Sequence, residues 1–231
     1  MKDTLDSRAV SPAARRFSAI ELLIALAVLF ASFPFVERLR AAEFIKSILL
    51  TVVLLSAVRS IAGRGRILTV ALCLAVPSLA ANWIHQYRPD LLPPEVFLIG
   101  AILLVAFVIF HLLTFVLRAP AVSTEVLCAS ISAYLLLGLV WTFAYWLVAE
   151  LIPGAFSLNV TSGADSSIKS FNGFYFSFIT LSTVGYGDIT PVAPVARMLA
   201  AAEAMTGLLY VAVLIARLVA LHAVPKPTNE N

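Results

Sequence analysis

Residues 180–191 read TLSTVGYGDITP, a polar stretch with two glycines that lies between two apolar segments. The 231-residue chain around it is 61% hydrophobic and 13% charged, and its mean hydropathy is +0.98. A water-soluble domain has about a quarter of its residues charged, so this composition indicates an integral membrane protein. In hydrocarbon, non-helical backbone survives only where protein buries it or where it lines a watery path. The stretch therefore marks a place where backbone carbonyls are used.

Six apolar runs are about 20 residues long, enough to cross about 30 Å of hydrocarbon as helices. They are Phe17–Val36, Phe44–Ile61, Ile67–Ile84, Val96–Leu117, Val126–Ala149 and Pro194–Leu221. A further apolar run, Phe171–Leu181, has only eleven residues and is too short to cross. Because this run ends at the quoted stretch, we expect the chain to enter the membrane there and to leave on the same side.

The runs predict an all-α, polytopic membrane protein in four parts. A cytoplasmic tail covers residues 1–16, a four-helix membrane domain 17–118, a pore domain 119–224 and a second cytoplasmic tail 225–231. The pore domain would consist of a helix, the short re-entrant helix, the quoted stretch and a last helix. With the N-terminus inside, nine basic residues fall in cytoplasmic segments and six in outer ones. This excess favours a multi-pass protein of the cell membrane with both termini cytoplasmic.

A cleaved signal peptide is the alternative for the first run, because Arg15 and Arg16 precede it. Against this alternative, the run is long, carries Glu21 near its start and lacks a clear small-x-small cleavage site. We therefore predict that the first run is a membrane helix.

The quoted stretch has the residue types that cation coordination needs. Gly185 and Gly187 can adopt positive φ at no steric cost, so successive carbonyls can turn toward one axis. The hydroxyl of Thr183 can add one more oxygen ligand at the inner end. Val184 and Tyr186 would then point away from the ion and pack the stretch against the short helix. That helix would aim its negative C-terminal end at the middle of the membrane, where a dehydrating cation is favoured.

In these features the sequence resembles the potassium channels of the pore-loop superfamily. Their selectivity-filter motif is present unbroken as Thr183–Gly187 and is followed by Asp188. Pro191 follows the motif, Arg197 opens the last helix, and Gly207 lies where the family often has a hinge glycine. The resemblance is to bacterial-type channels with six membrane helices, and it extends over a little under half of the chain.

The resemblance implies passive conduction of K⁺ through a selective pore. The expected ion ligands are the carbonyls of Thr183, Val184, Gly185 and Tyr186, with no cofactor apart from the permeant potassium ions. One loop cannot surround an ion, so four copies of the chain are needed around one axis. The expected partners are therefore three further copies and membrane lipid, with no nucleic acid and no small-molecule substrate.

Three residues are expected to support the filter: Tyr175, Ser182 and Asp188. In the family, an aromatic residue of the pore helix often bonds to the aspartate after the filter. Aligned on Thr183, the positions that do this hold Tyr175 and Phe176. Only Tyr175 can donate, so we hypothesise a hydrogen bond between Tyr175 and Asp188.

The last helix is expected to contain a gate. Glu203, Tyr210 and Arg217 recur at seven-residue spacing along one stripe of it. The face expected to line the pore is apolar and consists of Leu208, Val211, Ile215 and Val219. Such a lining suits a gate that closes by dewetting. Gly207 would permit a bend above the gate, although glycines in membrane helices also serve close packing.

The two charged residues of this stripe have different expected roles. Glu203 should pack behind the filter, protonated or hydrogen-bonded. Arg217 should reach the lipid headgroups or the linker Arg118–Glu125, because four guanidinium groups on the axis would repel a cation.

Other functions find less support in the sequence. A voltage sensor needs about three or four basic residues in the fourth helix, and Leu91–Leu117 has none. No H-E-x-x-H or G-x-S-x-G motif occurs, and Ser182 has no base in evidence, so we do not expect an enzyme. Two alternatives stay open, a non-selective cation channel and a non-conducting membrane scaffold subunit.

Overall fold

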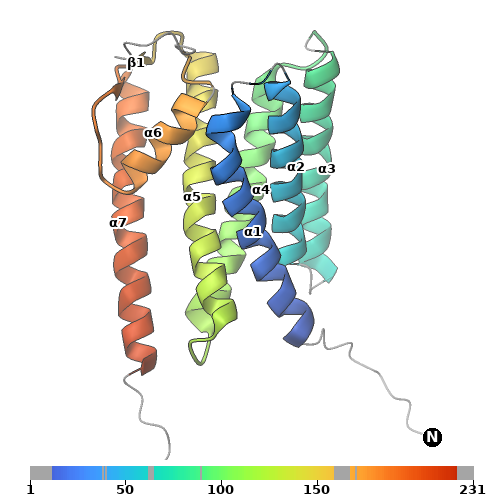
Figure 1. The fold of residues 1–231 in the computed structure, drawn as a ribbon, viewed down its shortest axis with the longest axis vertical. Coiled ribbons are helices and arrows are strands. Elements are labelled where there is room, and N and C mark those ends of the chain that lie inside the picture. The colour runs from blue at the N-terminus through green and yellow to red at the C-terminus, as the bar shows by residue number, and fades with distance from the viewer. Residues whose placement is uncertain are drawn as a thin grey trace, which may run out of the picture.

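The computed structural model describes residues 12–37, 39, 41–61, 65–88, 90–158, 167–169 and 171–222. These residues form seven helices (Figure 1), which are α1 Pro12–Val36, α2 Ala42–Ser60, α3 Gly65–Tyr87, α4 Pro94–Arg118, α5 Thr124–Leu151, α6 Phe171–Leu181 and α7 Pro194–His222. The predicted apolar runs coincide with these helices to within a few residues at each end. α1 begins inside the predicted N-terminal tail, whose first eleven residues lie outside the described part. The tail predicted for 225–231 lies outside it entirely.

Five of these helices are long and apolar enough to cross a membrane, namely α1, α3, α4, α5 and α7. The remaining long helix, α2, has 19 residues and runs beside the others (Figure 1). It carries Lys46, which pairs with Glu43 at 2.9 Å, and Arg59, which pairs with Glu21 of α1 at 3.1 Å. The prediction of an all-α polytopic membrane protein is confirmed. The count of six spans stays a prediction, because α2 carries three charged residues, Glu43, Lys46 and Arg59, within only 19 residues.

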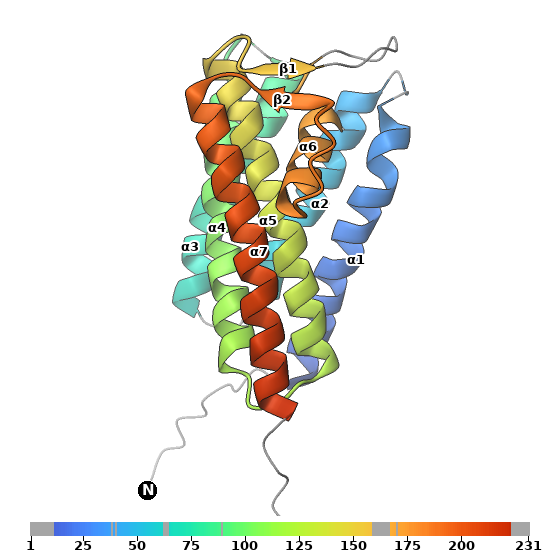
Figure 2. The same cartoon turned by 90° about the vertical axis from the view of Figure 1, so that its left-hand side faces the viewer.

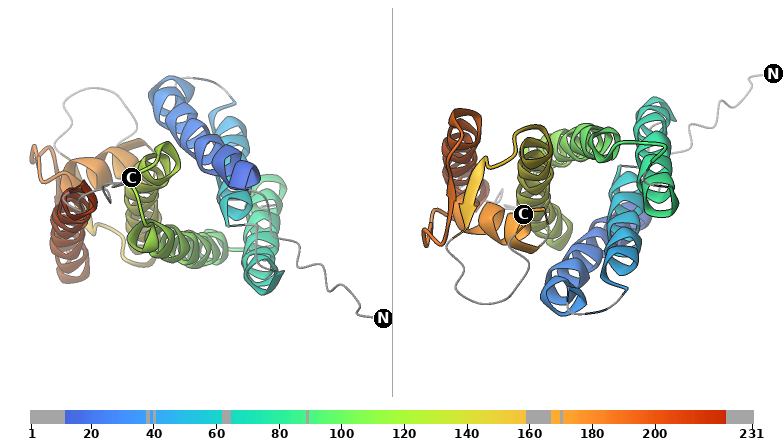
Figure 3. Two further views of the ribbon diagram at one scale, coloured as in Figure 1. Left: turned by 90° about the horizontal axis from the view of Figure 1, so that it is seen from below. Right: turned by 90° about the horizontal axis from the view of Figure 1, so that it is seen from above.

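α5 is the helix that joins the two parts of the molecule. It contacts α1 and α4 of the N-terminal group and α6 and α7 of the C-terminal group. Figure 2 and the end-on views of Figure 3 show α5 standing between them. α1 belongs to this core, because Leu22, Leu26 and Leu29 are fully buried. This packing favours the predicted membrane helix over a cleaved signal peptide.

α6 and the quoted stretch form a re-entrant segment, as predicted. α6 begins near the end of α5 and descends beside α5 and α7, and the chain then turns and rises again to the same end (Figures 1 and 2). We call this end of the molecule the filter end. There β1 (Phe156–Leu158) pairs antiparallel with β2 (Ile189–Pro191), with Phe156 opposite Pro191. The sequence did not indicate this ribbon, because three-residue strands are too short to show a period.

α6 lies very close to α5 at Gly138. A Cβ atom placed on Gly138 would lie 2.1 Å from Cζ of Phe178. The hydroxyl of Ser177 also donates to the carbonyl oxygen of Gly138 at 2.7 Å. The absence of a side chain at Gly138 therefore sets the distance between the two helices.

Replacing Gly138 with Ala should weaken this contact. The added methyl group would overlap the ring of Phe178, which is also held against Phe30 with ring centroids 4.3 Å apart. We expect a loss of about 1–3 kcal/mol of stability, the usual cost of overpacking. The midpoint of thermal unfolding in detergent measures it, and an unchanged midpoint would mean that Phe178 moves aside freely.

Candidate functional site

The backbone of the quoted stretch has positive φ at every second residue. The values are 60° at Thr183, 53° at Gly185 and 78° at Gly187. The two glycines were expected to adopt such angles, but Thr183 was not. A non-glycine residue in this region is uncommon and costs about 1–3 kcal/mol, which the surroundings must offset. Left-handed residues that alternate with ordinary ones allow successive carbonyls of a short chain to face one side.

The amides of the stretch point back to the end of α6. Val184 N and Gly185 N both donate to the carbonyl of Ile179, at 2.8 and 3.1 Å. Thr183 N donates to the carbonyl of Thr180 at 2.9 Å. These bonds satisfy carbonyls that the end of a helix leaves without a partner. Among the described residues, no backbone amide donates to the carbonyls of Thr183–Gly187, so these oxygens remain for another ligand.

The side chains of the stretch are exposed. Val184 is 52% exposed and Tyr186 is 72% exposed. The packing of both side chains against the short helix stays a prediction, because one chain alone leaves at least half of each exposed. The amides of Val184 and Gly185 do face α6 and bond to its carbonyl at Ile179.

The residues expected to support the stretch differ in what they contact. Tyr175 lies near Asp188, and a hydrogen bond between them stays a prediction. Asp188 Oδ1 accepts from the amide of Ile189, the first residue of β2, at 3.0 Å. The hydroxyl of Ser182 does not support Thr183–Gly187 directly, because it donates to the carbonyl of Phe178 at 2.7 Å. It therefore closes the last turn of α6.

A buried carboxyl group lies behind α6. Glu203 of α7 is fully buried, and its Oε1 accepts from the hydroxyl of Ser177 at 2.6 Å. Its Oε2 accepts from the hydroxyl of Tyr145 of α5. Glu203 of α7 thus bonds to both α5 and α6. It lies at the depth of α6, where the sequence predicted it.

The partners of Glu203 were not identified from the sequence. Ser177 interrupts an otherwise apolar side of α6, and an acid in an apolar span must find donors. These two facts indicated that a hydroxyl partner exists. They did not identify Tyr145, because the pairing of positions between helices depends on how the helices cross.

The predicted pore-lining face of α7 is exposed in the chain. The exposed fractions are 65% for Leu208, 42% for Val211, 56% for Ile215 and 62% for Val219. Arg217 contacts its own chain, because its Nη2 donates to the carbonyl of Ala119 at 2.8 Å. This is the predicted contact with the linker before α5. The guanidinium group is therefore held against the α4–α5 linker of its own chain.

Gly207 is a packing glycine. A Cβ atom there would lie 2.0 Å from the carbonyl oxygen of Leu181, the last residue of α6. α7 therefore touches the backbone of α6 two residues before Thr183, the first residue of the filter motif. The packing alternative has direct structural support, and the hinge stays a prediction.

Comparison with known proteins gives one family match. Residues 122–222, a little under half of the chain, match a family model described as "Ion channel". The match contains α5, α6, the quoted stretch and all of α7.

Several potassium channels are similar to parts of the chain. Two pore potassium channel c of Oryza sativa subsp. japonica is 31% identical over 87 residues, which are 38% of this chain and 19% of that protein. A voltage-gated potassium channel of Aeropyrum pernix is 37% identical over 61 residues, 25% of this chain and 21% of that protein. Two-pore potassium channel 1 of Arabidopsis thaliana is 33% identical over 87 residues, 38% of this chain and 20% of that protein. The chain thus spans about a fifth of the length of each of these relatives.

These comparisons show that the C-terminal part of the chain is similar to ion channels, in agreement with the resemblance seen in the sequence. Together with the five long apolar helices, they indicate a multi-pass membrane protein.

Removing the carboxyl group of Glu203 should destabilise the protein. Glu203→Ala leaves the buried hydroxyl of Tyr145 without its acceptor, whereas Ser177 keeps the carbonyl of Gly138. We expect a loss of about 2–4 kcal/mol for Glu203→Ala and about 1 kcal/mol for Glu203→Gln, which retains an acceptor oxygen. Thermal unfolding in detergent measures both, and equal stability of Glu203→Ala and the wild type would contradict a structural role.

Gly207→Ala separates packing from hinge bending. The methyl group would collide with the backbone at Leu181, so packing predicts a loss of about 1–3 kcal/mol. A hinge role alone predicts wild-type stability with altered channel opening. Thermal unfolding and single-channel recording of the same variant decide between the two.

Proposed function

We propose that four copies of this chain form a potassium-selective channel that conducts K⁺ passively. The observation that carries this proposal is the conformation of Thr183–Gly187, whose first three amides bond to α6 and whose carbonyls accept from no backbone amide within the described residues. The similarity to proteins named as potassium channels supports the choice of ion. Potassium is then the permeant ligand and not a resident cofactor.

A tetramer would account for the exposed parts of the C-terminal group. The carbonyls of one loop reach only one side of an ion, and four loops around an axis replace its hydration shell. Val184 and Tyr186 would then be covered by neighbouring copies, which explains why one chain leaves them exposed. The apolar face around Leu208 and Val211 would line the pore and would close it by dewetting.

The electrostatics of the C-terminal group suit a cation. α6 ends at Leu181, and the partial negative charge of its last carbonyls lies beside the start of the filter. Arg217 is bonded to Ala119, so its positive charge is held against the linker before α5 instead of being free to face the axis. Glu203 is enclosed by Tyr145 and Ser177 and does not reach the ion path.

The channel is proposed to work without a charged voltage sensor. The only lysine or arginine in α4 is Arg118, in its last turn. α1 begins and α7 ends at the end of the molecule opposite the filter end (Figure 2), which supports a cell-membrane topology with both termini cytoplasmic.

The test is K⁺ flux against Na⁺ flux into liposomes that contain the purified protein. We expect K⁺ flux well above Na⁺ flux, and we expect Gly185→Ala to abolish it, because alanine at φ 53° is strained by about 1–2 kcal/mol. Gly154→Ala is a matched control: Gly154 has φ 76° and lies in the turn before β1, so the strain is similar but the filter is untouched.

Two results would overturn the proposal in different ways. Equal K⁺ and Na⁺ flux would indicate a non-selective cation channel. Absence of flux for both ions, over a range of pH and lipid composition, would favour a non-conducting scaffold subunit.

A further inference from the structure

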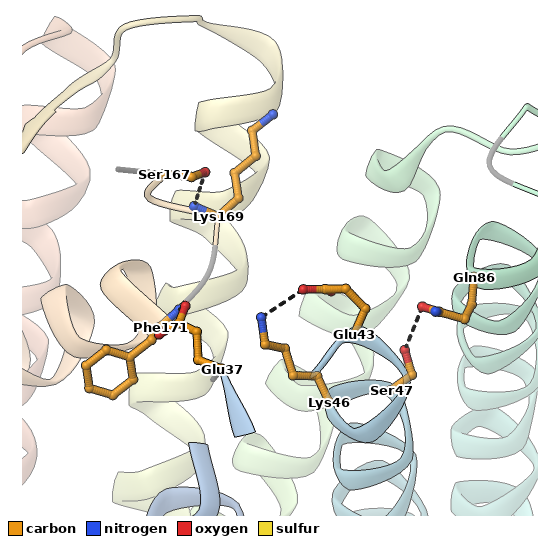
Figure 4. A network of polar contacts seen from close by, with 8 residues as sticks. All are labelled: Glu37, Glu43, Lys46, Ser47, Gln86, Ser167, Lys169 and Phe171. Atoms are coloured by element: carbon orange, nitrogen blue, oxygen red, sulfur yellow. Dashed lines mark hydrogen bonds and ion pairs between the residues drawn. The ribbon is translucent and has the colours of Figure 1, made fainter. Parts of the chain in front are cut away.

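Glu37 reaches from the end of α1 to the start of α6. Its Oε1 accepts a hydrogen bond from the backbone amide of Phe171 at 3.1 Å, across 134 positions of sequence (Figure 4). Phe171 is the first residue of α6, and the first amides of a helix have no acceptor within the helix itself. A carboxylate there also faces the positive end of the helix dipole. Glu37 therefore acts as a capping residue that a distant segment supplies.

A cluster of phenylalanine rings continues this contact along α6. Phe33 of α1 stacks on Phe174 with ring centroids 4.7 Å apart and an interplanar angle of 3°. Phe30 packs edge-on against Phe178, with centroids 4.3 Å apart, and against Phe174 at 4.7 Å. Phe33 is only 1% exposed. α1 thus holds α6 from its first residue to the turn before the filter.

Within the described part of the chain, the two lysines drawn near Glu37 in Figure 4, Lys46 and Lys169, pair with other carboxylates. Lys46 of α2 is buried, and its Nζ pairs with Glu43 at 2.9 Å (Figure 4). Lys46 is therefore paired with a carboxylate of its own helix, and the carboxylate of Glu37 accepts the hydrogen bond from the first amide of α6.

The filter is bonded to the other end of the same short helix. Ile179 accepts from the amides of Val184 and Gly185, so a movement of α6 along its axis moves these amides with it. A helix of eleven residues is roughly 16 Å long and too short to absorb such a movement by bending. The contacts of Glu37 at the start of α6 and of Ile179 at its end are therefore mechanically connected.

We propose that α1 is a positioning element for the selectivity filter and that Glu37 is its key positioning residue. This inference rests on the proposed channel function for its effect on conduction, whereas the capping of α6 does not depend on it. It gives the N-terminal helices a role that the family match does not cover, since that match begins at residue 122.

Hydrogen exchange of the full-length protein tests the capping directly. The variants are Glu37→Ala, Glu37→Gln and, as a matched control, Asp90→Ala. Asp90 is an exposed carboxylate in the loop between α3 and α4 at the filter end, so it controls for the lost charge. We expect exchange of the first turn of α6 to be about fivefold faster in Glu37→Ala, the effect of losing a typical N-cap. Glu37→Gln should show a smaller increase, because its amide oxygen still accepts, and Asp90→Ala should match the wild type.

Flux measurements on the same proteins test the positioning. Bound K⁺ stabilises the conducting filter by mass action, so a loosened filter needs more K⁺ to stay conductive. Glu37→Ala should therefore show a lower ratio of K⁺ to Na⁺ flux than the wild type. When the K⁺ concentration is lowered, the variant should stop conducting at a concentration at which the wild type still conducts. A variant that merely folds poorly would have fewer active channels with an unchanged ratio.

The outcomes separate this inference from the proposed function. Wild-type exchange of α6 in Glu37→Ala would overturn the capping. Faster exchange with an unchanged flux ratio and an unchanged K⁺ requirement would overturn the positioning. A wild-type protein that does not select K⁺ would overturn the proposed function and with it the positioning of a filter, while the exchange rates would still decide the capping.

Discussion

The structure around the quoted stretch depends on one constraint, the need to satisfy non-helical backbone at membrane depth. The carbonyl of Ile179 meets this need by accepting from Val184 and Gly185 together. In consequence, the amides of the stretch face α6 and its carbonyls are left for a ligand. The positive φ of Thr183 is the strained part of this arrangement, and it persists because the adjacent amides are fixed.

α6 can hold the stretch only if α6 itself is fixed, and two sets of contacts do this. On one side, Glu203 and Tyr145 bond to each other and Glu203 bonds to Ser177, while Gly207 lets α7 approach the end of α6. Toward α1, a carboxylate and two phenylalanine rings hold the helix. The first set is polar and buried, so its geometry is specific, because an unpaired hydroxyl there would cost about 1–3 kcal/mol. The second set belongs to the N-terminal helices, which makes them part of the support of α6.

The sequence predicts those features of the fold and the site that depend on residues close together in the chain, and it misses those that depend on residues far apart. Hydropathy locates the helices, because the membrane imposes a length of about 20 residues. The short re-entrant helix was predicted with the bounds it has, since its eleven residues stand apart from the long runs. The proximity of Tyr175 to Asp188 was also predictable, because the motif fixes their separation. The bond of Glu37 with Phe171 was not, since nothing local relates two residues 134 positions apart. The φ of Thr183 was missed because it is set by amides that follow it in the chain.

The burial of the helices shows where the chain needs further contacts. In α5, 56% of the apolar span is buried within one chain, whereas in α7 the share is 11%. Lipid alone does not explain this difference, because α7 also carries Gly207 and Glu203 against α6 and so cannot turn that face to hydrocarbon. A helix fixed on one side and bare on the others, beside a loop with unpaired carbonyls, is what a wall of a shared pore requires. In the proposed tetramer, the exposed face of α7 would line the pore below the ion site, and α5 would connect this wall with the helices that hold α6 from outside.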